Sequence, residues 1–331
     1  MIPTVRLTIT CTRLRNSVQW LFFAWIMYLG IQFGLFVRHF TSGGQTPFYP
    51  RPPGVEGFLP IGALTSLRHW LASGNFDTVH PAALVLFVTF LAMSLLTKKS
   101  FCSWLCPVGT LSELLWKLGQ RLAGRNFTMW SWLDVILRSA KYLLLGFFIK
   151  LLLLDMPTFT LGRFLQSPYW KMSDVKMLHF FTHISATSAT VITVLVVLSL
   201  VYKNFWCRYL CPYGALLGLI SMASPLKISR DSARCVGCGQ CSAACPSLLP
   251  VAEKTVIRSP ECTGCLSCVN SCANAAVAMA LYRRPVPPWL FAVLVLGVYA
   301  LGIATGMLSG HWHTSLTYAD YRQLIPQLNM F

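Results

Sequence analysis

Acidic residues are scarce in this chain, and charged residues of both signs are few. Of 331 residues, 10 are Asp or Glu and 27 are Lys or Arg, so charged side chains make up 11% of the sequence and hydrophobic ones 55%. This composition excludes the ordinary soluble globular class. A P-loop, a dinucleotide-binding fingerprint, a hydrolase triad and a flavin motif are also missing. A relay is therefore expected rather than a self-contained enzyme.

Apolar runs of membrane-spanning length explain the composition. They cover residues 17–37, 80–97, 135–154, 185–201 and 288–308. Basic residues at 138, 141 and 150 interrupt the third run and are expected to reach the membrane interface. The alternative is a lysine with a function inside the membrane. No small-residue cleavage site follows the first run, which predicts a retained anchor rather than a signal peptide. The expected fold is a mainly α, polytopic helical membrane protein with about five spans.

Basic residues are unevenly distributed between these runs. Seventeen Lys and Arg fall in segments 1–16, 98–134 and 202–287, and seven fall in segments 38–79, 155–184 and 309–331. Basic residues near spans concentrate on the cytoplasmic side, so the N-terminus is expected in the cytoplasm and the C-terminus in the periplasm of a bacterial inner membrane. The net charge of +17 is thus a topology signal. Lipid is the expected partner, and nucleic acid is not.

Eight cysteines repeat at one spacing within the last cytoplasmic segment. The runs are C-x2-C-x2-C-x3-C-P and C-x2-C-x2-C-x3-C, as in bacterial two-cluster ferredoxins, where the fourth cysteine of each run binds the other cluster. The predicted ligands are Cys235, Cys238, Cys241 and Cys272 for one 4Fe-4S cluster, and Cys262, Cys265, Cys268 and Cys245 for the other. Zinc sites rarely use this spacing, and a disulfide framework would need an oxidising compartment. The second run lacks the proline, because Ala273 stands where the first has Pro246.

A second cysteine motif occurs twice, 105 residues apart. Residues 101–111 read FCSWLCPVGTL and residues 206–216 read WCRYLCPYGAL, each at the cytoplasmic end of an apolar run. A C-x3-C spacing places both sulfurs on one helical face, and the proline and glycine that follow are expected to end the helix. If the two copies pack together, a four-thiolate site can form that holds a third iron–sulfur cluster, from Cys102, Cys106, Cys207 and Cys211. Free packed thiols and a copper or zinc site are the alternatives.

Histidines mark the opposite ends of the same two runs. His80 and His183 hold equivalent places in the repeat, which predicts a paired site for a quinone, favoured over haem. The alternative is two interfacial histidines satisfied by water or backbone. His311 and His313 form an H-x-H pair near the last run, for which metal binding is a further interpretation.

Together these motifs resemble NosR/NapH-type membrane polyferredoxins, in the short form without a flavin domain. The outer-segment sequences Arg51-Pro-Pro-Gly, Phe58-Leu-Pro-Ile and Asp77-x-x-His80-Pro are also similar to that family's. The resemblance implies a respiratory electron-transfer component between the quinone pool or cytoplasmic donors and a periplasmic acceptor. The alternative is an assembly factor that supplies electrons for maturation of a copper centre in an oxidase, although Met172 and Met177 are too sparse for a copper-handling stretch.

Three regions are expected from these patterns. A membrane domain with the two CxxxCP repeats covers 1–224, a cytoplasmic α+β ferredoxin domain covers 225–284, and the last transmembrane helix with a periplasmic tail covers 285–331. The ferredoxin segment is basic, which suits either anionic lipid headgroups or acidic redox proteins.

Overall fold

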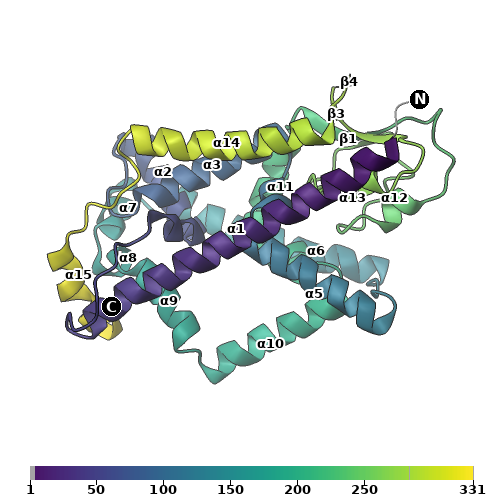
Figure 1. Cartoon of the computed structure of the whole chain (residues 1–331). Helices are drawn as coiled ribbons and strands as arrows, with labels where there is room; N and C mark the ends of the chain where they lie inside the picture. Colours follow the sequence, from purple (N-terminus) through teal and green to yellow (C-terminus); the bar gives the residue numbers. More distant parts are fainter. Residues whose placement is uncertain (1–3, 283, 331) are drawn as a thin grey trace. The chain divides into compact units, whose positions relative to one another are not determined.

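The computed structural model describes residues 4–282 and 284–330, with only the backbone described for residues 4–11 and 329. The described chain is mainly helical, with one small sheet (Figure 1). It divides into two compact units. Unit 1 comprises residues 1–23, 90–145 and 193–299, and unit 2 comprises residues 24–89, 146–192 and 300–331.

The chain passes from one unit to the other inside five helices. These are α1 (Thr4–Thr41), α3 (Pro81–Thr97), α6 (Ser131–Ile149), α10 (Ala186–Val201) and α14 (Pro288–Leu308). Each covers one of the predicted apolar runs, because a long run of apolar residues without internal proline satisfies its backbone only as a helix. The run at 135–154 continues beyond α6 as a π-helical segment, η2 (Lys150–Asp155).

Two helices, α1 and α14, are long and apolar enough to cross a membrane by themselves. Two bent pairs raise the count to four if each pair is one span. The pairs are α6–η2 with α7 (Thr158–Leu165), bent by 107°, and α9 (Ser173–Thr182) with α10, bent by 79°. Helix α3 is apolar but has 17 residues. Length and composition thus support two to four candidate spans among the described residues, against the five expected.

Unit 1 holds the cysteine motifs. Its shorter helical elements are α4 (Phe101–Trp104), α5 (Pro107–Ala123), η3 (Trp206–Leu210), α11 (Pro212–Ser221), α12 (Gln240–Ala243) and α13 (Ser267–Asn270). Its strands are β1 (Leu226–Arg230), β2 (Val256–Ile257), β3 (Val277–Leu281) and β4 (Arg284–Pro285). The predicted ferredoxin segment 225–284 lies wholly within this unit.

The four strands form an antiparallel sheet in the order β2-β1-β3-β4. In the middle of the sheet, Ile228 pairs with Ile257 on one side and with Met279 on the other. All three side chains are buried. Since neighbouring residues of a strand point to opposite faces, these side chains give the sheet one apolar inner face.

Unit 2 contains the remaining helical elements. These are η1 (Pro53–Phe58), α2 (Pro60–Ser73), η2, α7, α8 (Pro168–Lys171), α9, α15 (Tyr318–Leu324) and η4 (Ile325–Met330). A buried apolar core joins Phe33, Phe36 and Phe40 of α1 to Met172 and Tyr321. The segments after α1 and α14 are therefore packed parts of this unit.

Candidate metal centres

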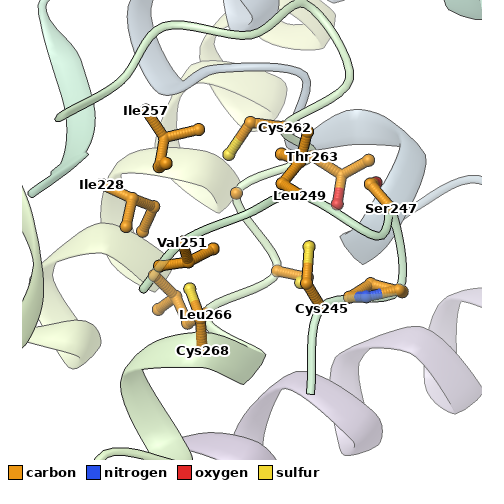
Figure 2. A pocket seen from close by; sticks show the side chains of 13 residues that line it. Ile228, Cys245, Ser247, Leu249, Val251, Ile257, Cys262, Thr263, Leu266 and Cys268 are labelled. Atoms are coloured by element: carbon orange, nitrogen blue, oxygen red, sulfur yellow. The ribbon is translucent and has the colours of Figure 1, made fainter. Parts of the chain in front are cut away.

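Four cysteines line one cavity in the ferredoxin segment. They are Cys245, Cys262, Cys265 and Cys268, the set predicted for the second cluster (Figure 2). The rest of the wall is largely apolar and includes Ile228, Leu249, Val251, Ile257 and Leu266, so the inner face of the sheet forms part of it. Cys245 comes from the first run and the other three come from the second, which is the exchange of fourth cysteines seen in two-cluster ferredoxins.

Burial dominates the electrostatics of this cysteine set. Burial first and the neighbouring thiols second raise the pKa of Cys245 to about 12 and the pKa of Cys268 well above its usual range. Four free thiolates would repel one another here, whereas cationic iron would hold them deprotonated. The donor set and its apolar surroundings fit a 4Fe-4S cluster.

The first cluster's predicted ligands are more exposed. Cys238 is exposed, and the backbone N–H of Gly237 together with Arg230 lowers the pKa of Cys235. Cys241 lies in α12, and Ser271, which precedes Cys272, donates a hydrogen bond to the carbonyl oxygen of Gln240 at 3.5 Å. This contact brings the end of the second run to the first, as the exchange requires.

The backbone around the CxxxCP cysteines departs from the expected helical face. Helix α4 ends at Trp104, and Cys106 has extended φ/ψ values of −68° and 120° as the N-cap of α5. Cys211 is likewise the extended N-cap of α11. The expectation of two sulfurs on one helix is wrong because a proline disfavours the α conformation of the residue before it. Each proline also begins the next helix, where its missing N–H costs nothing.

The four CxxxCP thiols nevertheless gather in unit 1. Cys207 interacts electrostatically with Cys102, Cys106 and Cys211, and burial followed by these thiols raises its pKa. Burial also raises the pKa of Cys106 to about 11. The thiol ends are desolvated, although each residue as a whole keeps some exposed surface. The two helix N-termini face the sulfurs, and Gly214 N–H donates to Cys211 Sγ at 3.2 Å. Helix N-termini of this kind favour thiolates.

Direct hydrogen bonds join the CxxxCP segments to backbone carbonyl groups near the ferredoxin cysteines. Ser103 Oγ donates to the carbonyl oxygen of Thr263 at 2.7 Å, and Trp104 Nε1 donates to that of Gly264 at 3.2 Å. Both donors lie between Cys102 and Cys106, and both acceptors lie between Cys262 and Cys265. In the second copy, Arg208 donates to the carbonyl oxygen of Ser247, two residues after Cys245. The two cysteine sets are therefore adjacent.

The predicted histidine pair has two different environments within unit 2. His80 is fully buried, with Nε2 2.8 Å from the carbonyl oxygen of Trp170 and Nδ1 3.3 Å from Glu56. His183 is exposed, and its ring stacks on that of His179 with centroids 4.3 Å apart. A quinone role for His80 and His183 stays a prediction.

A buried ionic network, which the sequence patterns did not predict, surrounds His80. Arg51 pairs with Glu56 at 2.8 Å and with Asp174 at 2.7 Å, and all three side chains are nearly inaccessible. Burial acts to lower the pKa of Arg51, but the two carboxylates outweigh it and raise that pKa. With only 10 acidic residues in the chain, each acidic residue in an apolar setting is a usable signal for such a network.

No group of three or more His, Cys, Asp or Glu side chains with the spacing to hold a metal ion occurs among residues 12–282, 284–328 and 330, whose side chains the structure describes. This finding concerns single ions such as zinc or copper. In a 4Fe-4S cluster each cysteine binds a different iron atom, so the sulfurs need not converge on one point. His311 lies against the ring of Phe76, with centroids 4.1 Å apart, and a metal role for His311 and His313 stays a prediction.

Comparison with known proteins gives the same chemistry. Residues 79–126 and 186–230 match a family described as "4Fe-4S binding domain", and residues 227–273 match one described as "4Fe-4S dicluster domain". The first pair of matches covers the two CxxxCP copies. No solved structure matches.

Three curated relatives carry the comparison to full-length proteins. The chain is 44% identical over 327 residues to the putative electron transport protein YccM of Escherichia coli, covering 96% of this chain and 91% of YccM. It is 26% identical over 263 residues to the ferredoxin-type protein NapH of E. coli, covering 76% and 84% of the two chains. It is 30% identical over 183 residues to the regulatory protein NosR of Pseudomonas aeruginosa, covering 54% of this chain and 25% of NosR. The chain belongs to the NapH/NosR/YccM-type family of ferredoxin-type 4Fe-4S membrane proteins.

Proposed function

We propose that this protein is a membrane-bound electron relay with three 4Fe-4S clusters. Two are held by the ferredoxin cysteines and the third by Cys102, Cys106, Cys207 and Cys211. Each cluster supplies one-electron transfer. The relay takes electrons from cytoplasmic donors or the quinone pool and delivers them towards a periplasmic acceptor.

The observation that carries the proposal is the pair of hydrogen bonds from Ser103 and Trp104 to Thr263 and Gly264. They connect the segment between two CxxxCP cysteines directly to the segment between two ferredoxin cysteines. A relay needs short gaps between carriers, and this arrangement supplies a continuous covalent and hydrogen-bonded path between the two cysteine sets.

The solvent exposure of the two ferredoxin cysteine sets suggests the order in which the clusters pass electrons. Cys238 is exposed and Val236, two residues before it, is 71% exposed, although Cys241 of the same set is buried. In the other set, Cys245, Cys262 and Cys268 are buried. The exposed set suits contact with a soluble donor. The proposed order puts the buried set between it and the CxxxCP cysteines, because the hydrogen bonds from Ser103 and Trp104 end at Thr263 and Gly264.

Iron content tests the third site. Protein purified without oxygen is expected to contain about 12 iron atoms per chain, falling to about 8 when Cys102, Cys106, Cys207 and Cys211 are all changed to Ser. A single Cys11→Ser change serves as the matched control, because Cys11 lies outside every motif. About 8 iron atoms in both the wild type and the four-serine variant would contradict the third cluster.

A further inference from the structure

Two buried lysines lie beside the CxxxCP cysteines. Lys99 is 4% exposed and Lys141 is fully buried. Lys99 Nζ donates to the carbonyl oxygen of Gly214 at 3.2 Å, in the turn that follows Cys211. Lys99 interacts electrostatically with Cys102, Cys207 and Cys211, and Lys141 does so with Cys102 and Cys211. Both cations therefore face the four-thiol site.

These cations exceed the anions that accompany them. One carboxylate, Glu261, serves both lysines, with Lys141 Nζ at 2.7 Å and Lys99 Nζ at 3.9 Å. Glu261 also accepts a hydrogen bond from Tyr142 Oη at 2.8 Å. An uncompensated buried cation is costly, so a surplus of positive charge in this place indicates a further anion nearby.

A cluster with four thiolate ligands is such an anion. It is negative when oxidised and gains one more negative charge on reduction. Fixed positive charge nearby stabilises the reduced form more than the oxidised form, because the Coulomb energy scales with the charge of the partner. The low dielectric of a buried site strengthens this difference.

We propose that Lys99 and Lys141 raise the reduction potential of the CxxxCP cluster, so that this cluster accepts an electron more readily. The proposal rests on the third cluster of the proposed function. In each transfer a ferredoxin cluster loses one electron and is oxidised, the CxxxCP cluster gains it and is reduced, and no proton moves. The lysines thereby stabilise the reduced form of the CxxxCP cluster.

A redox titration of the anaerobic protein with dithionite, followed by electron paramagnetic resonance, tests this. The CxxxCP signal is the one that the four-serine variant lacks. Its midpoint potential is expected to fall in Lys99→Met and in Lys141→Met, and to return close to wild type in Lys99→Arg. Lys117→Gln is the matched control, since this lysine of α5 is 41% exposed at its side chain.

A change of opposite sign separates electrostatics from packing. Glu261→Gln removes a negative charge at the same place, so the potential of this signal is expected to rise. If the lysines had only a structural role, the lysine variants and Glu261→Gln would not shift the midpoint potential in opposite directions. An unchanged potential in Lys99→Met at full iron content, or a fall in Glu261→Gln, overturns the proposal. Absence of the third signal from the wild type would instead contradict the proposed function.

Discussion

At the scale of single residues, the glycine after each CxxxCP motif has an unequal role in the two copies. A Cβ on Gly109 would lie 2.1 Å from the carbonyl oxygen of Cys102, whereas a Cβ on Gly214 would meet nothing closer than 3.4 Å, at Cys211 Sγ. The first distance requires the backbone that carries Cys102 to move. The second is an ordinary contact.

We therefore expect Gly109→Ala to lose about 4 iron atoms per chain, as the four-serine variant does, because one ligand is displaced. Gly214→Ala, the same change at the equivalent position, is expected to keep them. Iron analysis and the cluster absorbance of the two purified variants decide between these outcomes. Wild-type iron content in both variants would show that the site adapts to either change and would contradict this expectation.

The sequence could predict those site residues whose spacing is typical of a known cluster-binding motif. Cys245 could be assigned with the second run because the ferredoxin pattern specifies the exchange. Lys99 and Glu261 could not be placed beside the CxxxCP site, because their role depends on a contact between residues 162 positions apart. Lys99 reads in the sequence as a topology charge, yet its side chain is buried.

At the scale of elements, α1 and α5 are joined by a buried ion pair. Arg15 Nη2 lies 2.5 Å from Glu113 Oε1, with side chains 4% and 14% exposed. Gln19 donates to Glu113 at 3.1 Å and to the carbonyl oxygen of Ser103 at 2.8 Å, which connects α1 to α4 as well. Burial acts to raise the pKa of Glu113, but Arg15 and Lys117 outweigh it and lower that pKa. The carboxylate is therefore charged at neutral pH.

Removing this charge leaves Arg15 buried without a counter-ion. Glu113→Gln is expected to reduce the free energy of unfolding by about 3 kcal/mol. Lys117→Gln removes the exposed partner of the same carboxylate and is expected to cost under about 1 kcal/mol. Denaturation followed by loss of cluster absorbance gives both values, and similar losses in the two variants would contradict the assignment of the buried pair.

The same scale shows where sequence patterns are weakest. All five apolar runs are helices in the structure. In lipid, a helix satisfies the backbone hydrogen bonds of an apolar segment internally, so an apolar run of this length predicts a helix. The prediction of one helix through each C-x3-C motif is wrong. Cys106 and Cys211 each precede a new helix, which begins at Pro107 and at Pro212. A local rule for the residue before proline outweighed the helical period.

At the scale of the whole molecule, the number of spans decides on which side each terminus lies. Two or four spans would put both termini on one side of the membrane, whereas five put them on opposite sides. Helix α3 is the element in question, because its 17 residues extend about 26 Å against a hydrocarbon core of about 30 Å. The charge asymmetry favours five. Of the seventeen inner basic residues, the described part of the chain buries four, namely Arg15, Lys98, Lys99 and Arg208, and the excess over the outer segments remains.

We therefore expect a fluorescent protein fused before Met1 to fluoresce, since it does so only in the cytoplasm. Alkaline phosphatase fused after Phe331 is expected to be active, since this enzyme requires the periplasm. A phosphatase fusion at Gly74, after α2, is expected to be active, and one at Gly124, after α5, to be inactive. These internal positions are matched, because each is an exposed glycine at the end of a helix and they flank α3. Equal phosphatase activity at Gly74 and Gly124 would remove α3 from the spans. An inactive fusion after Phe331 would give the even count, and the positive residues of segment 202–287 would then need a role other than topology.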